Sequence, residues 1–407
     1  MTHELVIFGA TSFVGQILCH HLAERFAPNE LNWAMAGRSV AKLDGLKASL
    51  PESHRGIPSI VADAADEAAL KSMVDQARVV VSTVGPYDLY GEPLVKVCAE
   101  SGVDYCDLTG EVQWIRRMIA AYEDTAVASG ARIVHCCGFD SLPSDLGVYF
   151  LQQHAMERFG AYCERVKMRV RAMRGGASGG TIASMMNIAK QVAADPELRR
   201  ELADPYSICP RDSKPATRQP NVSFAKHDAD FDAWVTPFIM AAINTRIVHR
   251  SNALSDYTYG KDFRYDEAVL TGRGVKGRAA ATTAALAIGS FMAGASMAPT
   301  RWVLEKFVPA QGEGPSPTQQ EEGFFNLLFL GKTAKGERIQ VKVTGDRDPG
   351  YGSTAKMLTQ AGLCLARDID KGAAPGGFPT PATIFGSKLI DRLQAHAGLT
   401  FELVDEG

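Results

Sequence analysis

Short apolar runs alternate with helix-like segments throughout residues 1–140 of this chain. The first run, Leu5–Phe8, leads into a segment of helical apolar periodicity that extends through Ala23, and a second run follows at Leu31–Ala36. Further strand-like runs lie at Ile57–Val61, Val79–Val84, Val103–Asp107 and Arg132–His135. Strands that alternate with helices at these lengths form parallel sheets with right-handed crossovers. The pattern therefore predicts an α/β domain with a doubly wound parallel sheet.

The regular alternation of apolar runs and helix-like segments does not continue after residue 140. A helix is predicted over 142–159, and Val166–Val170 alternates as a strand does. An antiparallel pair is predicted at Phe324–Leu330 and Arg338–Val343, because glycines lie in the turn region between them. We therefore expect a second, α+β domain over residues 141–370.

The last segment, residues 371–407, contains a helical pattern at Thr383–His396 and a strand-like run at Leu399–Val404. We expect this segment to return to the first domain. Residues 204–220 are polar and contain prolines, so they are predicted to form a long loop.

One stretch of the second domain, residues 279–300, contains no charged residue and is bounded by Arg278 and Arg301. Its length reaches that of a membrane span, but its many Ala, Thr, Ser and Gly residues weaken the apolar gain on insertion. Three interpretations stay open: a span, a helix that lies on a membrane or lines a lipid-accessible cleft, and a buried core helix. We expect a helix beside the substrate cleft that touches membrane or acyl chain without crossing a bilayer.

The composition narrows the class of protein. The chain has 407 residues, 46% hydrophobic and 22% charged, with a formal net charge of −3. This is typical of a globular enzyme of two domains, and no basic excess favours nucleic acid as a partner. Eight cysteines form no C-x-x-C pair and no secretory leader precedes the first strand, so we expect a cytoplasmic protein without a metal site.

The turn after the first strand is the strongest chemical signal. Gly9 and Gly15 bound a strand–turn–helix whose backbone N–H groups suit a pyrophosphate, although Ser12 stands where a further glycine is common. Arg38 follows the second strand, where an NAD site usually carries an acid, so it suits a 2′-phosphate and predicts NADP(H). The expected cofactor-binding residues are Gly9, Thr11, Ser12, Phe13, Val14, Gly15, Arg38, Ser39, Asp63, Val84, Gly85 and Pro86.

Polar residues follow the fourth, fifth and sixth strands, whose carboxyl ends meet at one edge of a parallel sheet. The three segments are 82–87, 107–111 and 138–145. Ligands of open α/β sheets lie at this edge, so these side chains are predicted to surround the reactive end of the cofactor.

At these motifs the chain resembles the saccharopine dehydrogenase-like oxidoreductases, and among them the actinobacterial trans-acting enoyl reductases. The resemblance covers nearly the whole chain and rests on residues 9–15, 36–39, 84–87, 105–111, 138–145, 312–316, 348–352 and 380–382. It implies a Rossmann-type NADP(H) domain, a second α+β domain, and reduction of a carbon–carbon double bond in a lipid or polyketide thioester.

Such a reaction needs a hydrogen-bond donor for the developing enolate oxygen and a proton for the α-carbon. Under the resemblance, Tyr87 is the first candidate donor and Ser141 the second, while Asp140 or Glu111 relays protons if burial raises its pKa. Structural interpretations stay open: Tyr87 as a packing residue, Asp140 and Ser141 as a helix cap, Asp107 and Glu111 as caps of the helix from Val112.

Two other functions stay open. A saccharopine-type amino-acid dehydrogenase would bind small carboxylates through arginines such as Arg169, Arg171 and Arg174. A non-enzymatic NADP-binding regulator would keep the phosphate turn and Arg38 but lack a working substrate pocket. For the enoyl reductase hypothesis we expect a lipid-like acyl thioester substrate, a homodimer, and peripheral contact with the inner face of the cell membrane.

Overall fold

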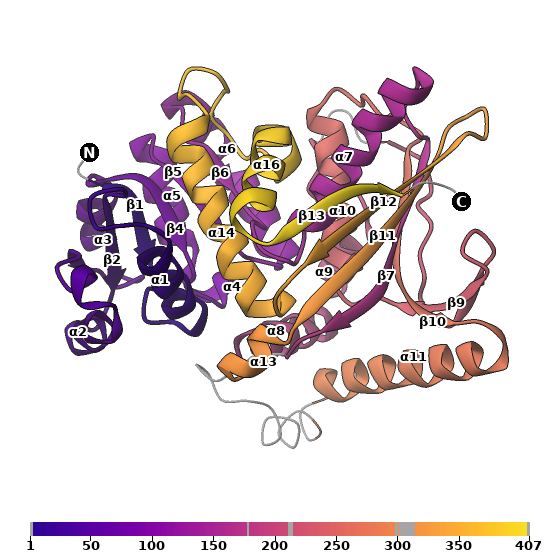
Figure 1. The fold of residues 1–407 in the computed structure, drawn as a ribbon, viewed down its shortest axis with the longest axis horizontal. Helices are drawn as coiled ribbons and strands as arrows, with labels where there is room; N and C mark the ends of the chain where they lie inside the picture. Colours follow the sequence, from indigo (N-terminus) through magenta and orange to yellow (C-terminus); the bar gives the residue numbers. More distant parts are fainter. Residues whose placement is uncertain (1–2, 177–178, 211–214, 298–299, 301–313, 405–407) are drawn as a thin grey trace. The chain divides into compact units, whose positions relative to one another are not determined.

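The structure is a computed structural model that describes residues 3–176, 179–210, 215–297, 300 and 314–404, with the backbone alone for 179–185. The chain forms two compact units (Figure 1). Unit 1 comprises Met1–Leu142, Gly312–Ser316 and Gly350–Gly398, and unit 2 comprises Pro143–Gln311, Pro317–Pro349 and Leu399–Gly407. Each unit is therefore assembled from segments that are distant in the sequence.

Unit 1 is built on a six-stranded parallel sheet of order β3-β2-β1-β4-β5-β6, as the alternating pattern predicts. Its strands are β1 (His3–Phe8), β2 (Trp33–Gly37), β3 (Ser59–Val61), β4 (Ala77–Ser82), β5 (Asp104–Asp107) and β6 (Ile133–Val134). Its helices are α1 (Phe13–Arg25), α2 (Val40–Ser49), η1 (Glu52–His54), α3 (Glu67–Val74), α4 (Tyr87–Tyr90), α5 (Glu92–Ser101), α6 (Val112–Ser129), α14 (Thr354–Leu363), η4 (Cys364–Asp368), α15 (Pro381–Ile384) and α16 (Gly386–His396). The central strands are buried on both faces, which explains their continuous apolar runs.

The second domain does not extend continuously to residue 370, contrary to the expectation from the sequence. Helix α14 belongs to unit 1, because it packs on the sheet of that unit. A Cβ on Gly362 would lie 2.8 Å from the Val81 side chain and 3.4 Å from that of Leu5. Every residue of α14 except Lys356 is buried. The glycine allows close contact of helix and sheet, a tertiary requirement that chain order does not reveal.

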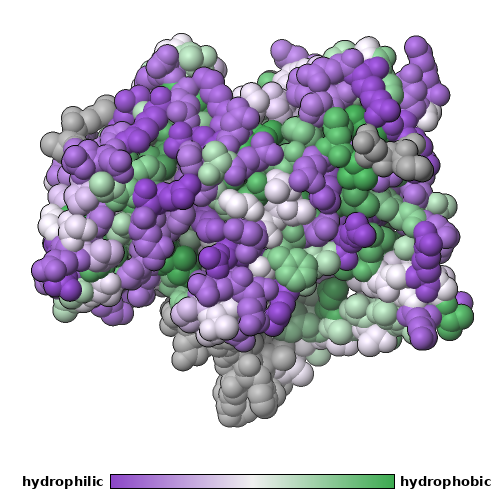
Figure 2. All heavy atoms as spheres, viewed as in Figure 1, coloured by the Kyte–Doolittle hydropathy of each residue, from purple (hydrophilic) through white to green (hydrophobic). Residues whose placement is uncertain are grey.

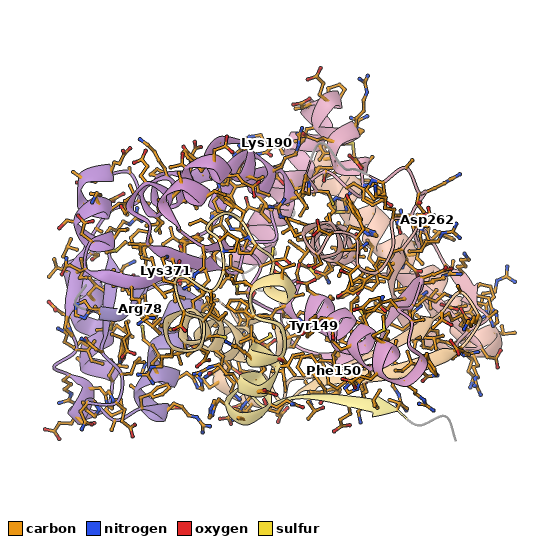
Figure 3. The ribbon with its side chains drawn as sticks, turned by 90° about the horizontal axis from the view of Figure 1, so that it is seen from above. Arg78, Tyr149, Phe150, Lys190, Asp262 and Lys371 are labelled. Atoms are coloured by element: carbon orange, nitrogen blue, oxygen red, sulfur yellow. The ribbon has the colours of Figure 1, made fainter. Side chains whose placement is uncertain are left out.

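An ion-pair cluster fastens the segment after α14 to the sheet. Arg132, which is fully buried, donates to the Asp104 carboxylate and to the main-chain carbonyls of Leu365, Ile369 and Asp370. Lys371 forms a second ion pair with Asp104, and Figure 3 shows Lys371 close to Arg78 in the same unit. These bonds satisfy a buried guanidinium that would otherwise be costly.

Unit 2 is built on a seven-stranded mixed sheet of order β13-β12-β11-β7-β10-β9-β8, in which only β7 and β10 pair in parallel among the described strands. Its strands are β7 (Arg165–Arg174), β8 (Lys226–Asp228), β9 (Ala233–Pro237), β10 (Arg264–Gly272), β11 (Phe324–Lys332), β12 (Arg338–Gly345) and β13 (Leu399–Val404). Its helices are α7 (Leu142–Phe159), α8 (Gly179–Ala194), α9 (Pro196–Ala203), α10 (Ala241–Leu254), α11 (Gly274–Ser296) and α13 (Pro317–Glu321), and η3 (Pro349–Ser353) begins at its boundary.

The expectation that the whole of residues 371–407 returns to the first domain is wrong for the last strand. Although α16 lies in unit 1, β13 pairs antiparallel with β12 in unit 2 instead of returning to the first domain. Phe401 of β13 lies 5.9 Å, between ring centroids, from Phe150 of α7, which is labelled in Figure 3. The alternating apolar residues of β13 therefore have their partners in the mixed sheet and on α7.

Helix α11 covers most of the uncharged stretch 279–300 and overturns its interpretation as a buried core helix. Its buried residues are Gly277, Ala281, Ala285 and Ala295. Only 17% of its most apolar 18-residue window is buried inside the structure, although by length and composition the helix could cross a membrane. Most of its apolar surface therefore faces away from the protein core.

Candidate functional site

The turn between β1 and α1 requires glycine at both ends. Gly9 has φ +82°, and a Cβ there would lie 2.7 Å from Val84 and 2.8 Å from the Thr83 hydroxyl. A Cβ on Gly15 would lie 2.2 Å from the Gly9 carbonyl oxygen. The turn therefore lies directly against the end of β4, and only glycines allow this approach.

Ser12 caps α1. Its hydroxyl accepts a hydrogen bond from the Gly15 N–H at 2.9 Å and pairs with the Thr83 hydroxyl at 2.9 Å, while Thr83 also donates to the Gly9 carbonyl. The helix itself supplies no partner for the N–H groups of Phe13 and Val14, since the first N–H groups of any helix point outward. This is the usual geometry of an anion site at a helix N-terminus, with Ser12 in the capping role instead of a further glycine.

Two distant segments cover the Phe13 ring. A Cβ on Gly314 would lie 2.5 Å from this ring, and the Tyr351 ring meets it edge-on with centroids 5.2 Å apart. Both segments carry motifs that the sequence analysis singled out, of which residues 312 and 313 lie outside the described part of the chain. The structure therefore brings these motifs to the glycine turn of unit 1.

Arg38 follows β2 at the carboxyl edge of the sheet and is exposed. Next to it, Ser39 caps α2 by accepting from the Lys42 N–H at 3.4 Å. Thr11 lies beside the end of β2, because its hydroxyl would be 3.8 Å from a Cβ on Gly37. Asp63, after β3, is exposed and accepts from the Ala65 N–H at 2.9 Å. An exposed guanidinium thus stands at the same sheet edge as the glycine turn.

Tyr87 begins α4, directly after Val84, Gly85 and Pro86, and is 4% exposed. Its hydroxyl donates to the Ser82 carbonyl at 3.0 Å and accepts from the Leu108 N–H at 3.4 Å. Burial raises its pKa well above the ordinary value, and the nearby Asp107 carboxylate raises this pKa further. The arrangement supports the packing interpretation of Tyr87, and its role as a hydrogen-bond donor to substrate stays a prediction.

Glu111 is buried and binds the start of α4, since its two carboxylate oxygens accept from the N–H groups of Tyr87 and Asp88 at 3.0 Å. It does not make a side-chain cap for α6, which begins at the next residue. The expectation that Glu111 caps the helix from Val112 is therefore wrong, because the carboxylate reaches the N-terminus of a different helix.

Asp107 joins the ends of β5 and β6. One carboxylate oxygen accepts from the N–H groups of Thr109 and Cys136, and the other from the Tyr105 hydroxyl at 2.9 Å and His135 Nδ1 at 2.7 Å. Cys136 has φ +62°, a strained conformation for a residue other than glycine, which these contacts hold in place. Asp107 therefore fixes the strand end that leads to Gly138 and Asp140.

Asp140 and Ser141 lie in the turn between β6 and α7. Gly138 packs against Thr354, whose hydroxyl accepts from the Phe139 N–H at 2.9 Å, and Ser141 is fully buried. Asp140 as a whole residue is partly exposed, but desolvation of its carboxyl raises its pKa to about 7. Among the predicted catalytic residues, Asp140 is therefore the one suited to hold an exchangeable proton near neutral pH.

Two of the three β7 arginines named above, Arg169 and Arg174, pair with carboxylates within unit 2. Arg169 is 2% exposed, and its guanidinium contacts the carboxylates of Asp228 and Asp266 at 2.6 Å each. Arg174 pairs with Glu322 at 2.6 Å. These ion pairs weaken the hypothesis that Arg169 and Arg174 bind a small carboxylate substrate.

The sequence comparisons decide the family. The family model of the saccharopine dehydrogenase NADP-binding domain matches residues 5–134. A trans-acting enoyl reductase of Mycobacterium tuberculosis H37Rv is 38% identical, with 96% of this chain and 95% of the relative covered. The chain belongs to the trans-acting enoyl reductase family. A second protein of that strain, provisionally named as such a reductase, is 40% identical over 98% of this chain and 97% of its own.

The fold of this enoyl reductase family member is similar to that of yeast saccharopine dehydrogenase (L-Glu forming) from Saccharomyces cerevisiae. That structure matches with a TM-score of 0.53 and 13% identity, over 98% of this chain and 99% of its own. At this identity the similarity concerns the fold alone. It agrees with the doubly wound sheet and second mixed sheet described above.

Unit 1 is the NADP(H)-binding domain, and its residues fit the cofactor. Gly9 and Gly15 allow the tight turn against β4 that leads into α1, and the N-terminus of α1 would supply N–H groups to a pyrophosphate. Arg38, together with Ser39 and Thr11, would provide a cation and hydroxyls for a phosphate on the adenosine ribose. Val84, Gly85 and Pro86 follow β4 beside this turn.

Sequence reasoning missed His135 and gave Asp107 only a capping role. Asp107 does not cap α6: it accepts from the Thr109 N–H, which precedes that helix, and from His135 and Cys136, which directly follow β6. No local sequence signal marks the pair: β5 and β6 pair in parallel with Cys106 opposite Val134, so Asp107 and His135, the next residues along the chain, are neighbours. Their contact follows from the register, which the sequence leaves undetermined.

Proposed function

We propose that this protein is an NADPH-dependent trans-acting enoyl reductase that reduces a carbon–carbon double bond in a lipid-like or polyketide acyl thioester. The observation that carries the proposal is 38% identity to a trans-acting enoyl reductase across nearly the whole of both chains. The glycine turn, Arg38 and the polar strand ends of unit 1 support it, because they supply the cofactor site and a proton-bearing group in one domain.

When bound, NADPH supplies the hydride that the β-carbon accepts. The chain must then stabilise negative charge on the thioester oxygen and deliver a proton to the α-carbon. We assign the proton to the Asp140 carboxyl, because its pKa of about 7 keeps a substantial protonated fraction at neutral pH. Tyr87 and Ser141 stay candidates for the hydrogen bond to the thioester oxygen.

The amino-acid dehydrogenase hypothesis has less support, since Arg169 and Arg174 are engaged with carboxylates of the protein. A non-enzymatic NADP-binding regulator would bind the cofactor through the same turn without turnover. The reductase would consume an enoyl thioester, the dehydrogenase an amino-acid substrate mixture, and the regulator neither. A single assay of NADPH consumption therefore separates the three functions.

The test is NADPH consumption by the purified full-length protein with enoyl thioesters, measured beside a lysine-plus-2-oxoacid mixture. NADPH deuterated on the transferable position should place one deuterium on the β-carbon of the saturated acyl product, detected by mass spectrometry. Deuterium on a carbon that was a carbonyl carbon in the substrate, or turnover only with the amino-acid mixture, would refute the enoyl reductase assignment. Tight NADPH binding without turnover of any thioester would favour the regulator.

A further inference from the structure

Helix α11 presents an apolar face outside the core of unit 2. It lies along β9, β10 and α8 (Figure 1), and the surface over it in Figure 2 is mostly white to green. The side that faces the protein is made of small residues, Ala281, Ala285 and Ala295, and Met292 packs with Met186 and Ala189. The covered side of the helix is therefore distinct from its exposed side.

The larger exposed apolar side chains lie along α11 and at its end. Val275 is 85% exposed, Leu286 58% and Met297 54%. Val275 and Leu286 are eleven residues, about three helical turns, apart, so these two side chains stand one above the other, and Met297 directly follows the last residue of the helix. Smaller uncharged residues complete this apolar line along the helix, at Ala279, Thr283, Ser290 and Ala293.

The charges of this region are concentrated at one end. Arg273, Lys276 and Arg278 stand at the N-terminal end of α11, and from residue 279 to 297 the chain carries no charge. The positive end of the helix dipole lies at the same place. The nearby Asp232 pairs with Arg273 at 3.5 Å, but both side chains are more than 70% exposed, so the pair neutralises little.

An aromatic residue accompanies the basic end. The Arg278 guanidinium lies 5.4 Å from the centroid of the Trp234 ring on β9, and Trp234 is partly exposed. Tryptophan beside basic residues is typical of the headgroup level of a membrane. The exposed side of α11 thus combines a basic and aromatic end with an apolar line.

We infer that α11 docks this face on the surface of an anionic lipid bilayer, with Arg273, Lys276 and Arg278 at the headgroups and Val275, Leu286 and Met297 against the acyl chains. Pairing with a second copy suits the charges less. Parallel α11 helices would bring the basic ends together, and an antiparallel partner helix would offer them no acidic residue, since residues 273–297 contain none. An anionic bilayer neutralises these residues and also takes up the apolar line.

Co-flotation of the full-length protein with vesicles tests this docking. We expect binding to vesicles that contain phosphatidylglycerol, weaker binding as salt rises, and little binding to phosphatidylcholine alone. Replacing Arg273, Lys276 and Arg278 with Gln should lower the partition coefficient roughly a hundredfold, at about fivefold per charge. The matched control replaces Arg55, Lys261 and Lys335, exposed basic residues on other segments, with Gln and should bind as the parent does.

A fluorescent probe places the helix itself. All eight native cysteines are buried, so Leu286→Cys offers a selectively reactive site for an environment-sensitive dye. Its emission should shift to shorter wavelength on anionic vesicles, whereas the dye on Lys335→Cys should not shift. Absence of flotation, equal loss in the control triple variant, or no shift at position 286 overturns the inference. It is also overturned if Val275→Gln, Leu286→Gln and Met297→Gln together convert a dimer to a monomer while the parent ignores vesicles, because a second copy then covers the face.

Discussion

Replacing Asp107 tests whether one buried carboxylate holds the strand ends that carry the proposed active site. Its side chain is inaccessible to solvent and accepts from four donors: the Tyr105 hydroxyl, His135 Nδ1, and the N–H groups of Thr109 and Cys136. Asp107→Ala removes every acceptor. Asp107→Asn keeps one carbonyl oxygen for the two N–H groups but turns an NH₂ group toward Tyr105 and His135.

The structure sets the size of the two effects. Removing one partner of a buried charged network costs about 3–5 kcal/mol, which we expect for Asp107→Ala. The four bonds do not add, because they share one carboxylate and water can enter the space that is left. Asp107→Asn should cost about 1–2 kcal/mol, since the Tyr105 hydroxyl can rotate and His135 can change tautomer to accept.

Urea unfolding of each variant without cofactor measures these costs. Trp114 is a natural reporter, because its ring lies 4.9 Å from that of His135 between centroids. Asp66→Ala is a matched control: Asp66 also accepts from two N–H groups, but as the exposed cap of α3, so it should cost about 1 kcal/mol. The reasoning fails if Asp107→Ala is no less stable than Asp66→Ala. We expect Asp107→Asn to displace the segment that carries Asp140 and so to lower turnover. Unchanged turnover in this variant would also contradict the reasoning.

Three further changes address the cofactor and the proton. Arg38→Ala should weaken NADPH binding about tenfold or more and leave NADH nearly unchanged in fluorescence titrations, because a charge-assisted bond to the 2′-phosphate contributes about 1.5–3 kcal/mol; equal effects on both cofactors would refute the assignment. Gly9→Val should abolish NADPH binding in a protein that still shows parental far-UV circular dichroism, since its side chain would meet Val84 and Thr83; retained tight binding would place the nucleotide elsewhere. Turnover should fall as pH rises through about 7, where Asp140 loses its proton, and Asp140→Asn should lower kcat and remove this limb of the profile; an unchanged profile would assign the proton to another group.

The first domain was largely predictable because its signals are local. Continuous apolar runs and helical periodicity are set by burial on both faces of a parallel sheet, so six strands could be recognised one by one. The glycine turn and Arg38 follow strands directly, and their place at the carboxyl edge depends only on the parallel alternation. The bounds of the second domain were harder to predict from the sequence, because α14 and β13 pack against segments that are distant from them in the chain.

The sequence by itself determined the alternating α/β domain, the dinucleotide turn and the choice of NADP(H), because each depends on residues that are neighbours along the chain. Only the tertiary structure decided that Asp107 meets His135, that Glu111 binds the start of α4, and that α11 keeps its apolar line exposed. Hydrogen-bond partners, desolvation and exposure depend on which distant segments pack together. The raised pKa of Asp140 is of this kind, since desolvation of its carboxyl by burial causes it.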